Sequence, residues 1–431
     1  MKSFLEPKTI AIIGASRDEN SVGYSLVKNL LDKKIYLINP NAKEILGIKT
    51  YSSILNVEED IELAIVAVPA KIVPKVVDEC GRKGTKNIII ISSGFSEVGN
   101  TELEDKLLRL KAKYNLRILG PNCLGVVTPH INASFAPSKC FDGNIAFVSQ
   151  SGALIDAILD WSLKEKYGFS ALVSIGNAID IGFEDWLEYF DADLGTKVIA
   201  LYIESLKDGR RFMNAAERIS KPIVVIKSGK TSKARKASKF HTGRMTSPYD
   251  LYKYAFKQSG IIEVDSLEEL FAVSKVLSVY PKTKNSVAVI SNAGGACVLS
   301  VDYAERYGLK LADISKLKEL DDFMPKIYNR RNPLDLVGDA TSARYAHALK
   351  VLLEQENIHA ILVIITPQNM TDVFNVAREV YNIQMDYSKP VLVCLMGGEK
   401  VRRAKEFLDN KDVPTFTDLR LACYALSKLV S

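Results

Sequence analysis

Short apolar runs rich in Ile and Val alternate along the chain with amphipathic stretches of helical period. The runs at residues 9–13, 63–68 and 87–91 are apolar almost throughout, and each is followed by a turn that contains Gly, Ser or Pro. Strands that are apolar on both faces and alternate with helices are typical of parallel sheets covered by helices on both sides. The sequence therefore predicts an α/β protein.

The alternating pattern stops and restarts twice along the 431 residues. Turn-forming residues at 129–137 and at 280–284 mark the two interruptions. A chain of this length also exceeds what one hydrophobic core usually supports. We therefore expect three domains: a Rossmann-like domain at residues 1–129, and two flavodoxin-like, doubly wound domains at residues 130–281 and 282–431.

Composition excludes several classes of protein. Hydrophobic residues make up 47% and charged residues 25% of the chain, which is the profile of a soluble globular protein. The net charge of +6 favours anionic ligands slightly, but no basic patch with interleaved aromatic residues indicates a nucleic-acid binder. The six cysteines occur singly, without histidines at metal-ligand spacing, so no metal site is expected. No signal peptide and no apolar run long enough to span a membrane are recognisable, and we expect a cytoplasmic protein.

Ligands of open parallel sheets bind outside the carboxyl ends of the strands, so the residues that follow each strand are informative. After the first strand, Gly14, Ala15 and Ser16 begin a turn into a helix whose free backbone N–H groups and dipole can hold a pyrophosphate. The next glycine is Gly23, which is too distant for the tight GxGxxG spacing of nicotinamide-binding proteins. A glycine that serves only the turn explains this loop equally well. The other strand ends of the first domain are Asn39-Pro40, Val68-Pro69, Ser93-Gly94-Phe95 with Glu97, and Pro121-Asn122-Cys123.

A second informative junction lies at residues 149–154, where a strand ends and a helix begins. There the backbone amides around Gln150 and Gly152 and the hydroxyl of Ser151 form a phosphate seat at the helix start. A strand followed by Ser-Gly and a helix is common, so the weight of this motif depends on those that accompany it. The accompanying motifs are Gly176-Asn177 and His241-Thr242-Gly243.

His241 is the candidate nucleophile. It lies in a long polar loop between a predicted strand at residues 222–226 and a predicted helix. Neutral imidazole is a good nucleophile near pH 7 and forms a phosphoramidate that remains reactive. Its second ring nitrogen needs a hydrogen-bond acceptor, and Glu204 at a neighbouring strand end is our candidate. A salt bridge from Glu204 to Arg210 or Arg211 is the competing interpretation.

Two other motifs invite a functional assignment that we do not expect. Residues 228–231 resemble the end of a Walker A motif, but the full motif requires a glycine at the position of Val224, which lies inside the strand. Cys123 follows a strand end, but nothing near it in sequence would lower its pKa, so we expect a small buried thiol. The loop cations, Lys227 and Lys230 among them, are expected to be solvated and to favour phosphate or nucleotide nearby.

Together these motifs resemble the succinyl-CoA synthetase superfamily, and in particular the alpha subunits of its NDP-forming acetyl-CoA synthetases. The resemblance implies that the turn after Gly14 holds the phosphates of CoA, and that Asn122 lies near the CoA thiol. It further implies that His241 and Glu204 are the catalytic residues. The implied CoA contacts are Gly14, Ala15, Ser16, Asn39, Pro40, Val68, Pro69, Ser93, Gly94, Phe95, Glu97 and Asn122, and the implied phosphate or acyl contacts are Gln150, Ser151, Gly152, Gly176 and Asn177.

The implied reaction is that of an ADP-forming acyl-CoA synthetase, in which acyl-CoA, ADP and phosphate give a carboxylic acid, CoA and ATP through an acyl phosphate and a phosphohistidine. The ATP-grasp domain of fused family members, which would bind ADP or ATP with Mg²⁺, is missing here, so the resemblance implies a separate beta subunit in an α2β2 heterotetramer. Phe240 and Arg244 depart from the family pattern around the histidine. A noncatalytic CoA-binding regulatory protein of the same fold therefore stays open as an alternative. A nicotinamide-dependent dehydrogenase is a second alternative, and the spacing after Gly14 argues against it.

Overall fold

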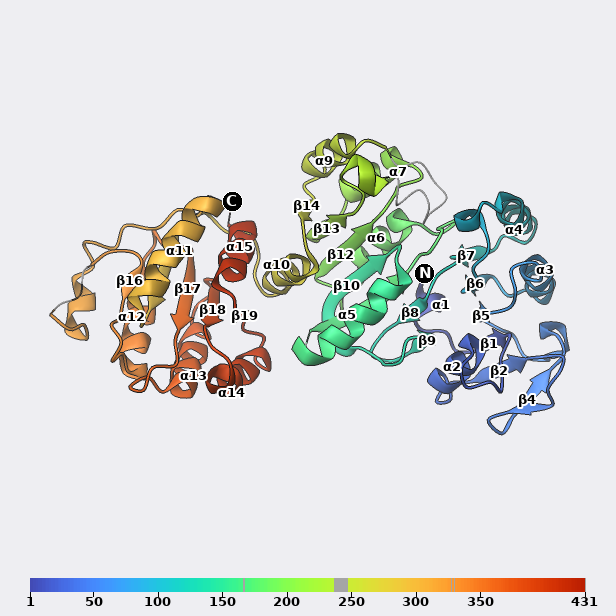
Figure 1. Ribbon diagram of the computed structural model, residues 1–431, viewed down its shortest axis with the longest axis horizontal. Helices are drawn as coiled ribbons and strands as arrows, with labels where there is room; N and C mark the ends of the chain where they lie inside the picture. Colours follow the sequence, from blue (N-terminus) through green and yellow to red (C-terminus); the bar gives the residue numbers. More distant parts are fainter. Residues whose placement is uncertain (166, 236–246, 327, 329, 431) are drawn as a thin grey trace. The chain divides into compact units, whose positions relative to one another are not determined.

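The computed structural model describes residues 1–165, 167–235, 247–326, 328 and 330–430. The chain divides into two compact units, Met1–Asp265 and Ser266–Ser431. The described residues contain three sheets with their covering helices, two sheets in the first unit and one in the second (Figure 1). This arrangement confirms the α/β fold class expected from the sequence, a Rossmann-like sheet followed by two doubly wound sheets of the flavodoxin type.

The first sheet has the strand order β3-β4-β2-β1-β5-β6-β7. Its strands pair in parallel except for the antiparallel β3–β4 hairpin. β1 and β5 are buried along their whole length, as their uninterrupted apolar sequences predict. The strands are β1 (Ile10–Ile13), β2 (Ile35–Ile38), β3 (Glu44–Ile45), β4 (Ile48–Tyr51), β5 (Leu63–Val66), β6 (Asn87–Ile90) and β7 (Arg117–Leu119). The helices around them are α1 (Lys2–Leu5), α2 (Val22–Asn29), α3 (Val73–Lys83) and α4 (Thr101–Tyr114).

The second sheet has the strand order β14-β13-β12-β10-β11-β8-β9. Its central strands are parallel, whereas β8 runs antiparallel to both β11 and β9. The strands are β8 (Gly125–Val127), β9 (Asn132–Ser134), β10 (Phe141–Ser149), β11 (Gly168–Ser174), β12 (Val198–Ile203), β13 (Ile223–Lys227) and β14 (Ile262–Val264). The helices are α5 (Gly152–Glu165), α6 (Phe183–Ala192), α7 (Gly209–Ala216) and α9 (Tyr249–Gln258). The chain thus enters the second sheet at β8, and the domain limits expected from the sequence stay a prediction.

The sheet of the second unit has the order β16-β15-β17-β18-β19, with every pair parallel. Its strands are β15 (Val287–Ser291), β16 (Leu334–Asp335), β17 (Ala360–Ile365), β18 (Val391–Leu395) and β19 (Thr415–Phe416). The helices are α10 (Leu267–Val279), α11 (Gly294–Tyr307), α12 (Ser342–Glu354), α13 (Val373–Gln384), α14 (Glu399–Asp409) and α15 (Leu419–Leu429). Among the described helices of both units, none combines the length and the apolar character that a membrane crossing requires.

Each sheet contains a point at which the chain reverses the direction of its connections. β1 has β2 on one side and β5 on the other, β10 lies between β11 and β12, and β15 lies between β16 and β17. The loops that follow the two strands at such a point leave in opposite directions, which opens space for a ligand at the carboxyl ends. In the first unit, these positions are the loops after β1 and β5 and those after β10 and β12.

Candidate active site

A cleft of about 490 Å³ joins the carboxyl ends of the two sheets in the first unit. From the first sheet it is lined by the loops after β5, β6 and β7, and from the second by the start of α5. The structure therefore brings together two groups of residues that lie far apart in the sequence. The expected CoA contacts that line it are Val68, Pro69, Ser93 and Asn122, and the expected phosphate contacts that line it are Gln150, Ser151 and Gly152.

The turn after β1 is shaped by two glycines. Gly14 has φ +95°, and a Cβ built there would lie 2.2 Å from the carbonyl oxygen of Ala67. A Cβ at Gly23 would lie 2.0 Å from the carbonyl oxygen of Gly14, so α2 can begin only against a bare backbone. The side-chain amide of Asn39 donates to the carbonyl oxygen of Ala15 at 2.8 Å and holds the turn from the end of β2. The conformation of the backbone beside β5 therefore depends on Gly14, Ala15 and Asn39.

The rest of this loop is held by its own polar groups. The hydroxyl of Ser16 accepts from the backbone amide of Asp18 at 3.0 Å. The hydroxyl of Ser21 accepts from the backbone amide of Tyr24 at 3.2 Å and so caps α2, while Pro40 lies exposed after the half-buried Asn39. Because α2 begins only at Val22, the free amides of its first turn come from the end of the loop and not from the Gly14 turn itself.

Ser92 was not singled out from the sequence, yet it shapes the side of the cleft that the first sheet forms. Its hydroxyl accepts from the backbone amide of Val68 at 3.1 Å and donates to the carbonyl oxygen of the same residue at 2.6 Å. These two bonds tie the loop after β6 to the loop after β5. They hold Val68 and Pro69 with their apolar surfaces toward the cleft.

Glu97 organises the loop that follows β6. One oxygen of its carboxylate accepts from the backbone amides of Gly94 at 2.5 Å and Phe95 at 3.1 Å, and the other accepts from the Asn177 side chain at 2.6 Å. Partial burial raises the pKa of Glu97, but the hydrogen bonds from Asn177 and from the two amides more than offset it, and the pKa lies below its ordinary value. Phe95 is fully buried in the core next to Val66 and Ile90, so its ring is not on the cleft surface, where we had expected it.

Asn122 and Cys123 follow the cis peptide between Gly120 and Pro121. Asn122 has φ +56° and lines the cleft, and its side-chain amide donates to the Asn177 side chain at 3.3 Å. Cys123 is buried, its thiol donates to the carbonyl oxygen of Ile90 at 3.3 Å, and burial raises its pKa to about 12. This confirms the interpretation of Cys123 as a small buried side chain.

The other side of the cleft is the junction between β10 and α5. The hydroxyl of Ser149 accepts from the backbone amide of Ser151 at 3.0 Å and donates to its carbonyl oxygen at 2.9 Å, and the Ser151 hydroxyl accepts from the amide of Leu154 at 3.4 Å. The first amides of a helix have no partner within the helix, and here Gly152 and Ala153 line the cleft. The junction therefore presents backbone N–H groups and the positive end of the α5 dipole to the cleft.

Gln150 closes the space between the ends of β10 and β12. Its side-chain oxygen accepts from the backbone amides of Glu204 at 2.6 Å and Ser205 at 3.0 Å, and its amide nitrogen donates to the carbonyl oxygen of Ser205 at 2.9 Å. The polar atoms of Gln150 are thus committed to the backbone of the neighbouring loop. Its role in the structure is to hold the Glu204 loop beside the start of α5.

Lys227 lies next to Glu204 and corrects an expectation from the sequence. It is the last residue of β13 and is only 2% exposed, so it is not one of the solvated loop cations. Its ammonium group donates to the carbonyl oxygen of Glu204 at 2.8 Å and to that of Ser228, and it lies 4.4 Å from the centre of the Tyr252 ring. Burial lowers the pKa of Lys227 to about 8, although the charges of Glu204 and Glu263 oppose this shift.

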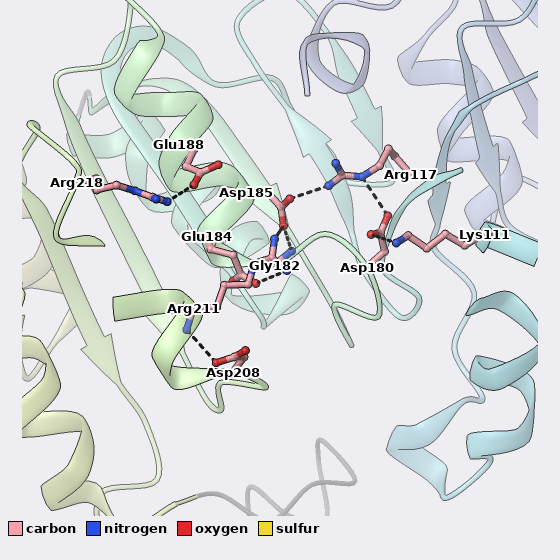
Figure 2. Close-up of polar contacts among 10 residues, drawn as sticks. All are labelled: Lys111, Arg117, Asp180, Gly182, Glu184, Asp185, Glu188, Asp208, Arg211 and Arg218. Carbon is pink, nitrogen blue, oxygen red and sulfur yellow. Dashed lines mark hydrogen bonds and ion pairs between the residues drawn. The ribbon is translucent and has the colours of Figure 1, made fainter. Parts of the chain in front are cut away.

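Two cations that the sequence analysis singled out, Arg211 and Lys230, pair with carboxylates other than Glu204. Arg211 pairs with Glu184 at 3.3 Å and with Asp185 at 3.4 Å, which Figure 2 shows on the starts of α6 and α7. Lys230 pairs with Glu263 at 2.8 Å and with Asp265 at 2.6 Å instead of being solvated. The candidate nucleophile His241, with Phe240, Gly243 and Arg244, lies outside the described residues.

The second unit repeats the junction that begins α5. The hydroxyl of Ser291 accepts from the backbone amide of Ala293 at 3.1 Å, and the side chain of Asn292 accepts from the amide of Thr366 at 2.9 Å and donates to its carbonyl oxygen at 2.9 Å. In the first unit, Ser149 likewise accepts from the backbone amide of Ser151, and Gln150 likewise bonds to the backbone of the loop after β12. In the part of the chain that the structure describes, no group of three or more His, Cys, Asp or Glu side chains is placed to hold a metal ion.

Three family models match the chain in sequence order. A CoA binding domain matches residues 8–129, a succinyl-CoA ligase like flavodoxin domain matches residues 142–277, and a Ligase-CoA domain matches residues 287–425. The first two ranges contain the loops that meet at the cleft.

Known proteins extend the likeness over the whole chain. It is 40% identical over 439 residues to an ADP-forming acetate–CoA ligase I of Archaeoglobus fulgidus, and it spans 63% of the length of that protein. It is 39% identical over 451 residues to the alpha subunit of an ADP-forming acetate–CoA ligase I of Pyrococcus furiosus, covering 100% of this chain and 97% of that subunit. The dinucleotide forming acetyl-coenzyme A synthetase 1 of Ca. Korarchaeum cryptofilum, solved in complex with phosphate and ADP, superimposes with a TM-score of 0.94 and 36% identity over 99% of this chain and 96% of that one.

Proposed function

The chain belongs to the family of ADP-forming acetate–CoA ligases, and on this premise we propose that it is the alpha subunit of an ADP-forming acyl-CoA synthetase. One observation carries the proposal: the loops of the Rossmann-like sheet and the start of α5 line the same cleft. A thioester held by the first group of loops would end beside an anion seat formed by the second. These are the two groups that a reaction between acyl-CoA and phosphate must bring together.

The proposed CoA side of the cleft has a polar part that suits the phosphates and an apolar part that suits the pantetheine arm. The loop between β1 and α2 and the first turn of α2 supply backbone amides for the phosphates, and Val22 continues the wall of the cleft. Val68 and Pro69 supply apolar surface for the pantetheine arm. Asn122 lines the same cleft as this surface and Ser151, and we assign it to the reactive thiol end of CoA.

The proposed reaction begins with phosphate at Ser151 and Gly152. A phosphate oxygen attacks the thioester carbonyl carbon, the carbon–sulfur bond breaks, and CoA leaves as the thiolate while an acyl phosphate forms. The imidazole of His241 then attacks the phosphorus, and the carboxylate leaves with the bridging oxygen. Transfer of the phosphoryl group from His241 to ADP gives ATP. The amides at the start of α5 would stabilise the charge on the moving phosphoryl group.

Glu204 is proposed to support the imidazole during transfer. A carboxylate that accepts from the second ring nitrogen fixes the tautomer and stabilises the cation that forms. Gln150 supports this role because it holds the backbone of Glu204 beside the phosphate seat. Lys227 fixes the same backbone from the other side through the Glu204 carbonyl oxygen.

ADP or ATP, with Mg²⁺, would bind to a separate ATP-grasp beta subunit in an α2β2 assembly. The name of one relative supports this part of the proposal, because the Pyrococcus protein that is 39% identical to this chain is itself called a subunit alpha. We expect a cytoplasmic enzyme that uses acyl-CoA and phosphate and binds neither nucleic acid nor membrane.

The experiment is to incubate the purified chain with acetyl-CoA and radiolabelled phosphate. We expect an acid-labile, base-stable label on the wild-type chain and none on His241→Ala. His130→Ala is the control, because His130 is exposed and lies on the loop between β8 and β9. Retention of the label in His241→Ala would refute the assignment of the phosphohistidine.

The alternative is a noncatalytic CoA-binding regulatory protein of the same fold, which the departures at Phe240 and Arg244 favour. The same labelling experiment separates the two functions. A wild-type chain that binds CoA in calorimetry but acquires no label would favour the regulatory protein.

A further inference from the structure

The loop between β11 and α6 is bound to the edge of the first sheet. Its alternate backbone amides, those of Asn177, Ile179 and Ile181, donate to carbonyl oxygens of residues 118–121 at 2.9, 3.1 and 3.2 Å. One row of backbone hydrogen bonds therefore joins this loop, which leaves the second sheet, to β7 and the turn that follows it in the first.

The side chain of Asp180 completes this edge. Its Oδ2 atom accepts from the backbone amide of Ile118 at 2.8 Å and from Nε of Arg117 at 3.2 Å, and its Oδ1 atom pairs with Lys111 at 3.0 Å (Figure 2). The side chain is only 6% exposed. Charge-assisted bonds in such a position are stronger than their solvated counterparts, and removing their acceptor leaves a buried amide without a partner.

Arg117 connects Asp180 to the start of α6. Its second nitrogen, Nη2, donates to Asp185 at 2.8 Å, and Asp185 accepts from the backbone amide of Gly182 at 3.0 Å. Figure 2 shows the Arg117 guanidinium between the two carboxylates. Partial burial would lower the pKa of Arg117, but the hydrogen bond to Asp185 and the charge of Asp180 outweigh it and raise the pKa.

Helix α4 holds the loop at two points. Glu104 and Lys111 are seven residues apart and therefore lie on the same face of the helix. Glu104 accepts from the Asn177 side chain at 2.9 Å, and Lys111 pairs with Asp180. One face of α4 thus contacts the two polar side chains that border residues 178 and 179.

The loop between β11 and α6 packs against the turn that contains Asn122 and lines the cleft. Gly176 has φ +52°, and a Cβ built there would lie 2.2 Å from the carbonyl oxygen of Pro121 and 2.5 Å from that of Asn122. Asn177 accepts from the Asn122 side chain. We propose that Asp180 is a positioning residue that, through Arg117 and Lys111, keeps Gly176 and Asn177 against Asn122 and so fixes the end of the cleft that receives the CoA thiol.

This inference rests on the proposed CoA site, and its test uses the full chain. We expect Asp180→Ala to weaken CoA binding in calorimetry by about tenfold. Asp180→Asn keeps an oxygen for the Ile118 amide but loses the ion pairs, and we expect a loss of about threefold. In both variants the amides of Asn177 and Ile179 should exchange with deuterium faster than in the wild type.

Asp191→Ala is the matched control. Asp191, at the other end of α6, accepts from the backbone amides of Ser220 and Lys221 at 2.9 and 3.2 Å, so its loss also removes a carboxylate that holds a turn. We expect it to lower thermal stability without changing CoA affinity. With the partner subunit present, Asp180→Ala should raise KM for CoA.

Three outcomes would overturn the proposal: unchanged CoA affinity in Asp180→Ala, unchanged exchange at Asn177 and Ile179, or an equal loss of affinity in Asp191→Ala. A wild-type chain that binds no CoA would contradict the proposed function instead. The exchange measurement needs no CoA, so it tests the positioning role of Asp180 in either case.

Discussion

Gln150 accepts the backbone N–H of Glu204 at 2.6 Å. The residue that follows β10 therefore fixes the loop that follows β12, across the point where the connections of the second sheet reverse direction. A polar side chain fills the space that doubly wound sheets usually leave for a ligand. The proposed phosphate seat consequently lies to one side of this space, at the start of α5.

Gln150→Ala is expected to leave the amides of Glu204 and Ser205 without acceptors, at a cost of about 1–3 kcal/mol in the free energy of unfolding. We also expect phosphorylation of the chain by acetyl-CoA and phosphate to slow by roughly tenfold, because Glu204 loses its fixed position. Urea denaturation and the initial rate of labelling measure the two effects. Gln258→Ala is the control, because the exposed Gln258 bonds only to the Glu217 side chain among its described hydrogen bonds. Equal labelling rates in wild type and Gln150→Ala would contradict the prediction.

Lys227 should give the stability of the chain a characteristic pH dependence. Its pKa is about 8 in the folded chain and 10.5 in the reference state, so between these values the unfolded chain holds a proton that the folded chain has lost. Stability therefore rises with pH in this window. Relative to Lys227→Met, the wild-type free energy of unfolding should increase by roughly 3 kcal/mol from neutral pH to the upper end of the window. Lys233→Met, at an exposed position, is the control, and identical pH slopes for wild type and Lys227→Met would rule the effect out.

A comparison of Gly14→Ala with Gly84→Ala separates the cost of a left-handed backbone from the cost of a steric clash. Both glycines have φ near +90°, but a Cβ at Gly14 meets the Ala67 carbonyl oxygen at 2.2 Å, whereas nothing lies within 4 Å of one at Gly84. Gly84→Ala should cost about 1–2 kcal/mol of stability through its left-handed backbone alone. Gly14→Ala should cost more and should abolish CoA binding, because β1 and β5 must move apart. Thermal unfolding and calorimetry with CoA are the measurements, and equal behaviour of the two variants would be the contrary result.

Glu97→Gln should destabilise the chain at neutral pH and not in acid. The folded pKa of Glu97 lies below 4.5, so the stability that its carboxylate contributes is present above that pH and is lost as the pH falls through the folded pKa. The difference in free energy of unfolding between wild type and Glu97→Gln should therefore shrink on acidification. Glu102→Gln, at an exposed position on α4, is the control. A difference that is constant between pH 7 and acid would show that the charge of Glu97 is not what matters.

Many elements of the fold and of the site have a local signature. The apolar runs at β1 and β5 predict buried parallel strands because burial on both faces requires apolar side chains at consecutive positions. Gly14 is predictable as a turn residue, and the Ser149–Gly152 segment as a helix start, because the conformations needed there restrict which residues can serve. The expectation that Cys123 is a small buried thiol follows from its sequence neighbours, because none of them would lower its pKa.

Other roles depend on partners that are distant in the sequence. Lys227 ends an apolar strand and precedes a polar loop, and its burial is decided by Tyr252 on α9 and by Glu204, which follows β12. Phe95 is directed into the core rather than the cleft because Glu97 holds the backbone of its loop. Asp180 resembles any acidic loop residue until β7 and α4 bring Arg117 and Lys111 to it.

The amino-acid pattern alone was thus sufficient for the class of fold, the order of its sheets and the loops in which a site could lie. Packing between elements decided which side chains of those loops face the cleft and which hold the backbone. The reason is physical: strand and helix formation depend on neighbouring residues and on burial, whereas the direction and charge of a side chain depend on the atoms that the folded chain places around it.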